Sequence, residues 1–391
     1  MPKDYSPFTP GYVVPVEFFA GRKKEVEKLR DKVLQAASGR LQVAFLSGER
    51  GIGKSSLAHF VKALVERESR VLGIHVFLGG VTTLEELVRK LFDQLLKDSV
   101  EKAWHEKIKD VFGTHIKQVG LFGVSLEFGA SREDLRKIAN DIVPALQNLT
   151  DRLKDDRKGM FIILDDINGL ADSETFANWL KSTIDGISTS SKQLPLCLLL
   201  VGYEERRQSL IRLQPSLARV FDLIEINTWS FEETNEFFKN AFKQAGVLFG
   251  DDAIGRMSKY AGGLPVLAHE IGDAVYNIDE DNYISIDDTM RGLLQAADIV
   301  GRKHLEPQVL NAIQSRHYRT ILKKVGTEPF EFHFQRGKVR ASLGKLEERV
   351  FDNFLRKMSK LGVITREPEK GSGYYRFSNL LHYLYFVMQA R

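Results

Sequence analysis

The sequence contains one cysteine, 11 prolines and no long apolar run in its 391 residues. The single cysteine, Cys197, excludes an internal disulfide and a zinc site built from several cysteines. It lies in the apolar stretch LPLCLLLV, which predicts a buried packing residue. Without eighteen consecutive apolar residues a transmembrane helix is not expected, and the polar start MPKDYSPFTPGYVVP lacks the apolar centre of a signal peptide. We therefore expect a cytoplasmic protein without membrane contact.

Charge is distributed unevenly along this chain. With 43% hydrophobic and 28% charged residues over 391 positions, the chain can form two or three globular domains. The net charge is +4, but residues 301–391 hold 18 lysines and arginines against 8 aspartates and glutamates. The remaining residues are mildly acidic. A basic C-terminal region predicts an anionic partner, and a solvated basic surface is the alternative.

Five short apolar runs separated by helical patterns predict an α/β layer with a parallel sheet. The runs are residues 41–47, 71–79, 160–166, 194–202 and 223–226. Residues 1–20 are expected to form an extended arm, because Pro2, Pro10 and Pro15 disfavour a helix.

Other segments complete this outline. Residues 83–110 and 131–153 predict helices, and residues 119–129 predict a hairpin. Residues 230–305 read as helical throughout, broken by Gly246, Gly250 and residues 262–265. From about residue 306 the pattern is helix, the short strand EFHF, further helices, two strands around a polar glycine turn, and a last helix.

The turn after the first predicted strand matches the complete pattern G-x-x-x-x-G-K-[ST]. The candidate phosphate-binding residues are Gly48, Glu49, Arg50, Gly51, Ile52, Gly53, Lys54, Ser55 and Ser56. Glycines let backbone N–H groups turn toward phosphate oxygens, and the following helix adds its N-terminal partial charge. Lys54 would reach the β- and γ-phosphates, and the Ser55 hydroxyl would ligate Mg²⁺. A chance match in a surface loop is the alternative, which the strand and helix on either side argue against.

A second anionic group is expected at the end of the strand FIILDD. Asp165 and Asp166 follow four apolar residues, and ligands of open parallel sheets bind beyond the carboxyl ends of the strands. Asp165 would hold Mg²⁺ directly or through water, and Asp166 would orient the attacking water. The alternative is a pair of helix-capping aspartates. Together the two motifs predict binding and hydrolysis of ATP with Mg²⁺.

With these motifs the chain resembles the P-loop ATPases of the AAA+ and STAND groups. It is most similar to prokaryotic ATPases between the archaeal origin-recognition initiators and STAND proteins. Residues 18–23, FFAGRK, match the opening pattern of that group, with Glu25 and Leu29 in place. The resemblance implies that Gly21 and Arg22 lie near the adenine of ATP or ADP. For Arg22, a plain helix-start residue is the alternative.

The resemblance also assigns residues around the fourth and fifth strands. The family keeps a polar sensor 1 residue where this chain has Gly202, so Tyr203 or Glu204 would have to substitute. Arg219 in PSLARVF matches the arginine finger, which in the family often acts on a neighbouring subunit of an oligomer. The alternative for Arg219 is an ordinary surface or ion-paired arginine.

Downstream, GGLP at residues 262–265 is similar to the G-x-P element of STAND ATPases, whose lid packs on the nucleotide, with Pro265 as the contact. A turn between two helices is the alternative. No sensor 2 arginine can be placed, which favours a switch over a fast motor.

The C-terminal region resembles a winged helix, in which one helix enters the major groove of DNA and the wing touches phosphates. The candidate phosphate contacts are Arg336, Lys338, Arg340, Lys345, Arg356, Lys357 and Lys370. Winged helices also dock proteins, so duplex DNA and a protein partner both remain open.

The predicted fold class is therefore α/β, with a P-loop parallel sheet, a helical lid and a winged helix. The expected parts are an arm (1–20), an ATPase core (21–228), a lid (229–305) and a winged-helix-like domain (306–391). The expected function is an ATP-hydrolysing, DNA-associated switch, and the alternative is a STAND-like signalling or scaffold ATPase whose winged helix contacts protein.

Overall fold

The computed structural model describes residues 5–100, 102–113, 116–119, 125–310, 313, 315–327 and 332–390. The chain divides into two compact units. One contains Val13–Asn227, and the other joins the N-terminal residues up to Tyr12 with the chain from Thr228 onward. The chain therefore passes from one unit to the other twice. The four-part division expected from the sequence stays a prediction.

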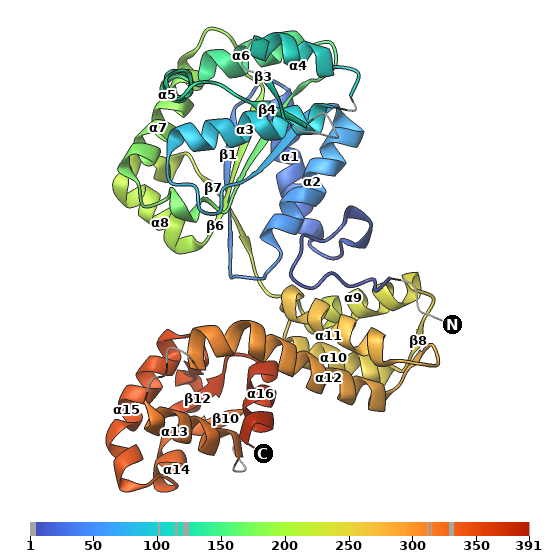
Figure 1. Cartoon of the computed structure of the whole chain (residues 1–391), viewed down its shortest axis with the longest axis vertical. Helices are drawn as coiled ribbons and strands as arrows, with labels where there is room; N and C mark the ends of the chain where they lie inside the picture. Colours follow the sequence, from blue (N-terminus) through green and yellow to red (C-terminus); the bar gives the residue numbers. More distant parts are fainter. Residues whose placement is uncertain are drawn as a thin grey trace. The chain divides into compact units, whose positions relative to one another are not determined.

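A five-stranded parallel sheet forms the centre of the first unit (Figure 1). The order of its strands is β2-β5-β6-β1-β7. Its strands are β1 (Gln42–Gly48), β2 (Val71–Phe77), β5 (Gly159–Asp165), β6 (Leu196–Gly202) and β7 (Asp222–Ile226). All five predicted strands are confirmed. Because all strands run parallel, their carboxyl ends meet at one edge, where Asp165 is level with Phe77 on one side and Val201 on the other.

The central strands read as unbroken apolar runs because both sheet faces are covered. Every residue of β5 and β6 is buried. Cys197 on β6 is fully buried, and burial raises the pKa of its thiol to about 12, so its predicted packing role is confirmed.

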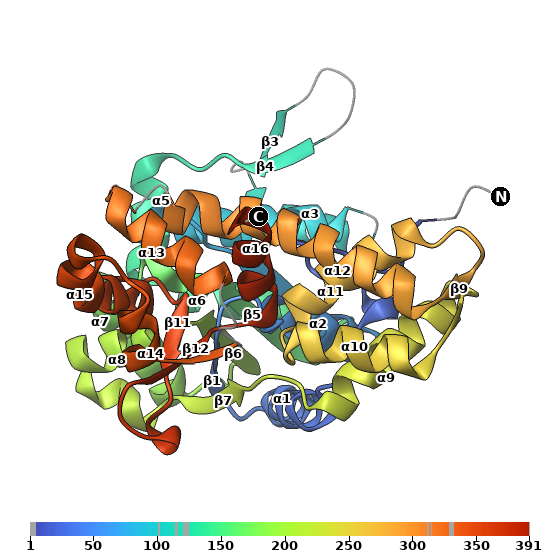
Figure 2. The same cartoon turned by 90° about the horizontal axis from the view of Figure 1, so that it is seen from below.

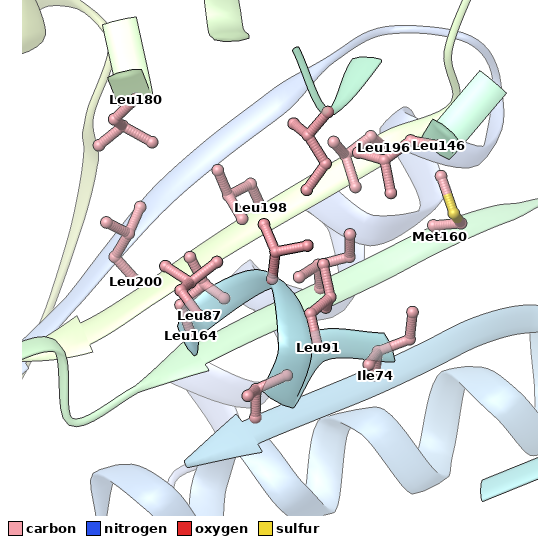
Figure 3. Close-up of a cluster of buried hydrophobic side chains, with 14 of the residues drawn as sticks. Ile74, Leu87, Leu91, Leu146, Met160, Leu164, Leu180, Leu196, Leu198 and Leu200 are labelled. Atoms are coloured by element: carbon pink, nitrogen blue, oxygen red, sulfur yellow. The ribbon is translucent and has the colours of Figure 1, made fainter. Parts of the chain in front are cut away.

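Helices cover both faces of this sheet. They are α1 (Lys23–Ala37), α2 (Lys54–Ser69), α3 (Leu84–Ser99), α4 (His105–Phe112), α5 (Arg132–Asn140), α6 (Val143–Leu153), α7 (Glu174–Thr189) and α8 (Glu204–Leu213). Short 3₁₀ turns are η1 (Val16–Phe18), η3 (Ile167–Gly169) and η4 (Pro215–Arg219). A large apolar core joins one face of the sheet to α3, α6 and α7, where Leu87, Leu146 and Leu180 meet Met160, Leu198 and their neighbours (Figure 3).

Two predicted helices of this unit are each divided. Residues 83–110 form two helices, α3 and α4. Where α3 ends, the buried Ser99 hydroxyl donates to the carbonyl of Leu96 and faces Nδ1 of His105, the first residue of α4. Residues 131–153 form α5 and α6, because Pro144 fits only the first turn of a helix. A hairpin is present, formed by β3 (Ile116–Val119) and β4 (Ser125–Phe128), which pair antiparallel. Its first strand begins at Ile116, before the predicted segment 119–129, and residues 120–124 lie outside the described residues.

The second unit begins with α9 (Phe231–Gln244), α10 (Asp251–Ala261), α11 (Pro265–Ile278) and α12 (Ile286–Val300). The breaks predicted at Gly246, Gly250 and residues 262–265 lie at the ends of these helices. The short parallel pair of β8 (Leu248–Phe249) and β9 (Tyr283–Ile284) was not predicted. Phe8 of the N-terminal segment is buried among these helices, with its ring 5.3 Å from that of Phe242, and the N–H of Thr9 donates to Nδ1 of His269. Phe8 therefore belongs to the core of the helical unit, and Thr9 is bound to one of its helices.

The remaining elements lie between residues 301 and 390. They are the π-helical segment η5 (Gly301–Leu310), α13 (Arg316–Thr327), β10 (His333–Gln335), α14 (Arg336–Ala341), α15 (Lys345–Lys360), β11 (Ile364–Arg366), η6 (Pro368–Lys370), β12 (Tyr374–Phe377) and α16 (Leu380–Ala390). The strands form an antiparallel sheet in the order β10-β12-β11. The strand expected at EFHF begins only at His333, and Glu331 lies outside the described residues.

The terminal helix joins this region to the preceding helices. In Figure 2, α16 lies against α12, and the two helices are in contact. The Tyr385 hydroxyl on α16 donates to Glu306 of η5. A side chain at Gly301 would overlap the Tyr385 ring, so glycine allows the close approach. The α/β fold class predicted from the sequence is confirmed, and no helix among the described residues is long and apolar enough to span a bilayer.

Candidate active site

The P-loop connects β1 to α2 at the carboxyl edge of the sheet. Gly51 and Gly53 adopt φ angles of 76° and 94°, in the left-handed region that glycine enters without steric cost. At Gly48 a Cβ atom would lie 2.8 Å from the carbonyl oxygen of Ile226, so a side chain has no room. The predicted strand, glycine turn and helix are all present. The loop leads directly into the N-terminus of α2 at Lys54, and such a helix start favours anions.

Lys54 folds back over the P-loop. Its Nζ donates to the carbonyls of Gly48 and Glu49, at 2.8 and 2.7 Å, and lies 4.8 Å from the centre of the Tyr203 ring. Burial lowers the pKa of Lys54, while the charges of Asp165, Asp166 and Glu49 act in the opposite direction. The ammonium therefore sits in the field of both predicted aspartates. An arriving phosphate would supply a stronger acceptor than the two carbonyls.

Asp165 occupies the last position of β5 and is 2% exposed. Its Oδ2 lies 2.8 Å from Nε2 of His75, a buried residue of the neighbouring strand β2. Sequence reasoning did not identify His75. A histidine inside the apolar strand VLGIHVF was the available signal, because a buried imidazole needs a polar partner.

Asp166 differs from its neighbour. It is exposed and has a φ of 56°, a left-handed conformation that is unusual outside glycine. Its Oδ1 accepts a hydrogen bond from the Asn168 amide. A Cβ on Gly79 would lie 3.0 Å from Oδ2 of Asp166, so the glycine leaves room for this carboxylate. The left-handed conformation of Asp166 thus lies where the chain passes from the buried Asp165 to an exposed carboxylate.

Arg22 is buried at 6% exposure, and its guanidinium binds protein groups. It donates to the carbonyl of Ile52 in the P-loop at 3.2 Å and to the carbonyl of Asn227, with Glu25 3.8 Å away. Arg22 and Gly21 both have positive φ, at 61° and 72°. The side chain therefore fixes the back of the P-loop to the end of the sheet unit. The expected position of Gly21 and Arg22 beside adenine stays a prediction.

The two serines after Lys54 have different environments. Ser55 lies in the first turn of α2, where the motif requires it. Ser56 is buried, and its hydroxyl accepts a hydrogen bond from the N–H of Val14 at 3.2 Å. Ser56 thus anchors the segment before α1, a contact that the motif does not indicate. Glu49 and Arg50 are exposed on the loop.

The end of β6 has no room for a sensor side chain. A Cβ on Gly202 would lie 3.3 Å from both Ile167 and Phe45, so these residues fill the space. The next residues reach the P-loop strand instead, because Glu204 accepts a 3.4 Å hydrogen bond from the Ser47 hydroxyl. Glu204 also pairs with Arg207 at 2.6 Å, and the bonds from Arg207 lower the pKa of this carboxyl.

Two predicted residues lie apart from this cluster. Arg219 ends η4 and is exposed, without an ion pair inside the part of the chain that the structure describes. Pro265 begins α11 in the second unit, and the GGLP turn is fixed there by a 2.8 Å hydrogen bond from the N–H of Trp229 to the carbonyl of Gly263. The roles of Arg219 and Pro265 stay predictions.

The side chains at this site suit a cation that takes part of its ligand shell from phosphate. Within the described ranges, no three histidine, cysteine, aspartate or glutamate side chains gather into a metal cluster. Asp165 and Ser55 offer one carboxylate and one hydroxyl, and nucleotide phosphates and water would have to complete the shell. Mg²⁺ binds proteins in this way, through one or two carboxylates and substrate phosphates. The residues therefore fit Mg²⁺ better than a cation that needs a complete protein site.

Comparisons with known proteins agree with this geometry. Residues 19–200 match the family model of the AAA ATPase domain, whereas no curated protein matches the chain. The chain is similar to the Walker-type ATPase of Pyrococcus abyssi, with 16% identity and a TM-score of 0.57 over 98% of this chain and 99% of that one. It is also similar to the ORC2 protein of Aeropyrum pernix in its ADPNP-ADP complexes, with 16% identity and a TM-score of 0.62 over 99% and 98% of the two chains. At this identity, the likeness to solved structures establishes the fold alone.

Proposed function

We propose that this chain, an ATPase whose residues 19–200 match the AAA ATPase domain, is a Mg²⁺-dependent switch that associates with duplex DNA. The DNA role rests on one observation, a row of exposed cations along α15. The nucleotide role rests on the P-loop and the two aspartates at the edge of the sheet. The two roles belong to different units of the chain.

For hydrolysis, Lys54 would leave the two P-loop carbonyls and bind the β- and γ-phosphates. Ser55 and Asp165 would hold Mg²⁺, which when bound neutralises phosphate charge and orients the phosphates. The exposed Asp166 would orient a water molecule toward the γ-phosphate and accept its proton as the phosphate leaves ADP. Gly202 has no side chain, so Tyr203 beneath Lys54 is the residue best placed to respond to the γ-phosphate.

Arg219 is proposed as an arginine finger that acts on a neighbouring copy. Arg219 is exposed and has no ion pair in the described part of the chain. Its guanidinium is therefore available to a neighbouring copy. In that case activity per chain should rise with protein concentration. Mixing Arg219→Ala with Lys54→Ala chains should restore activity at composite sites. Activity that is independent of concentration, with no recovery on mixing, would leave a monomeric switch.

The cation row of α15 consists of Lys345, Arg349, Arg356 and Lys360. At 3.6 residues per turn, these positions fall within about 60° of one another around the helix. All four are exposed. Beside this row, a groove of about 500 Å³ runs between α15 and the β11–β12 hairpin and includes Arg356 and Arg366. A helix that carries cations next to a cation-lined wing fits the backbone of a duplex, where contacts to phosphate set position and supply affinity.

One observation favours the alternative protein partner. Arg336 and Arg340 of α14 bind two acids on α15. Arg336 forms two hydrogen bonds to Asp352, and Arg340 forms one to Glu348. These acids reduce the positive field, and the Leu346 side chain is 59% exposed at the start of α15. A mixed charged and apolar surface suits protein docking, as expected for a STAND-like signalling ATPase. Arg336 and Arg340 are therefore weaker candidates for phosphate contact than the sequence predicted.

Fluorescence anisotropy with a labelled duplex at several salt concentrations tests the DNA role. Each phosphate contact contributes about −0.9 to the slope of log affinity against log salt, so Lys345→Gln/Arg349→Gln should flatten the slope by about 1.8. The control Arg132→Gln/Arg136→Gln removes two exposed cations at the same spacing from α5 and should leave the slope unchanged. ATP binding should be unaffected in both variants. No binding by the unmodified chain at low salt, with or without ATP, would reject DNA in favour of a protein partner. A cytoplasmic location stays the expectation from the sequence.

A further inference from the structure

His75 and Asp165 form a buried pair across two adjacent strands. The Nε2 atom of His75 lies 2.8 Å from Oδ2 of Asp165, and the side chains are 4% and 3% exposed. In the parallel pairing of β2 and β5, His75 is level with Ile163 and Phe77 with Asp165. Alternation along each strand then places His75 and Asp165 on the same face of the sheet. The pairing of the strands therefore determines this contact.

The surroundings of the imidazole leave it one hydrogen bond. The ring stacks on Phe77 with 4.4 Å between centres, and the His59 ring on α2 lies 6.2 Å away. Its Nδ1 is buried and has no hydrogen-bond partner among the described residues. The carboxylate of Asp165 likewise has His75 as its one hydrogen-bond partner in the described part of the chain. A buried ring whose hydrogen bonding is devoted to one carboxylate controls the orientation of that carboxylate.

We propose that His75 is a positioning residue that orients Asp165 for Mg²⁺. With a proton on Nε2, the imidazole donates to Oδ2, and this leaves Oδ1 available for the cation or for a water molecule of its shell. Hydrogen bonds from outside the ligand shell fix the orientation of a metal-binding carboxylate, and their loss typically costs 10–100-fold in metal affinity. This role rests on the proposed Mg²⁺-dependent function. The competing explanation is a polar pair that only stabilises the sheet.

Two amide substitutions distinguish these explanations in the full chain. The side-chain nitrogen of glutamine reaches the position of Nε2, whereas that of asparagine corresponds to Nδ1 and falls short of Asp165. The probe is a fluorescent ADP analogue, titrated with Mg²⁺ and also measured without it. We expect His75→Asn to raise the half-saturating Mg²⁺ concentration about tenfold and His75→Gln to restore it to near the original value. Nucleotide binding without Mg²⁺ should change less than about twofold in both.

His59→Asn is the matched control, because it changes a neighbouring histidine that does not bind Asp165. It should leave the Mg²⁺ titration unchanged. If His75→Asn and His75→Gln lower the thermal midpoint but shift the Mg²⁺ titration no more than this control, His75 is structural and the positioning role is wrong. If Mg²⁺ does not affect nucleotide binding by the unmodified chain, the proposed metal site itself fails, and the role of His75 fails with it.

Discussion

Charged side chains serve different purposes in the two units. At the sheet edge of the first unit, Arg22 and Lys54 donate to backbone carbonyls, and Asp165 is bound by a buried histidine. On α15 of the second unit, Lys345 and Arg349 are exposed. A buried charge must find its hydrogen bonds inside the protein, whereas an exposed charge exchanges a partner for water at little cost. We therefore expect replacements at the sheet edge to alter catalysis and folding, and replacements on α15 to alter binding alone.

Lys54→Ala should produce the largest change and tests the sheet edge directly. Loss of the cation that meets the phosphates should reduce turnover on the order of a thousandfold and weaken ATP binding. Phosphate release at saturating ATP measures this. Lys62→Ala removes a lysine from the same helix, where it pairs with Glu66 and Asp98, and should retain activity. Full activity of Lys54→Ala would show that the P-loop assignment is wrong.

Arg22→Ala should lower the free energy of unfolding by about 3 kcal/mol. The substitution leaves the carbonyls of Ile52 and Asn227 without their charged donor, and each buried unpaired carbonyl costs roughly 1–3 kcal/mol. Urea denaturation measures the change. Lys24→Ala, an exposed lysine on α1, should stay within about 0.5 kcal/mol of the original value. Equal small effects for both would remove the distinction between buried and exposed cations in this unit.

Asp166→Asn should separate binding from chemistry. The exposed carboxylate has no structural role beyond its hydrogen bond from Asn168 in the described part of the chain, so ATP affinity should be retained. Hydrolysis should slow on the order of a hundredfold, the scale of losing a general base. Equilibrium ATP binding and single-turnover hydrolysis measure the two effects. Asp155 is an exposed acid elsewhere in the unit, and Asp155→Asn should change neither ATP affinity nor the rate of hydrolysis. An unchanged rate of hydrolysis in Asp166→Asn would reject the proposed role of Asp166 toward water.

Arg340→Gln should have the smallest effect. Its ion pair with Glu348 is half exposed on both sides, so the contribution to stability should be at most about 0.5 kcal/mol. Thermal unfolding checks this, with Lys338→Gln as an exposed neighbour without an ion pair in the described ranges. A loss well above that of Lys338→Gln would indicate that the second unit also depends on its ion pairs.

Much of the site was predictable because its motifs are local. The eight residues from Gly48 to Ser55 specify the loop and the helix start that binds phosphate, and the apolar strand before Asp165 indicates where the carboxylates emerge. The contact of His75 with Asp165 was not predictable, because the partners are 90 residues apart and meet only when β2 pairs with β5. The same holds for Arg22, whose acceptors are 30 and 205 residues away.

The fold was predictable to a similar depth. Continuous apolar runs indicated all five parallel strands, because a strand covered on both faces needs no polar alternation. The two helices predicted at 83–110 and 131–153 are each divided in the structure, after Ser99 and before Pro144, within patterns that are otherwise helical. The positive charges of α14 and α15 are visible in the sequence, but the pairing of Arg336 with Asp352 depends on how these two helices pack.

The burial of Phe8 has a consequence for the order in which the chain acquires structure during synthesis. Thr9 and its partner His269 are 260 residues apart, so a segment that leaves the ribosome early must wait for helices that are made much later. The central sheet, complete by residue 226, can assemble while that segment is still unattached. The helices then pack on the Phe8 ring, which has been exposed to solvent until that point. Contacts between residues 260 positions apart in the sequence form slowly. A bulky fusion placed just before this segment would therefore delay the helices more than the sheet.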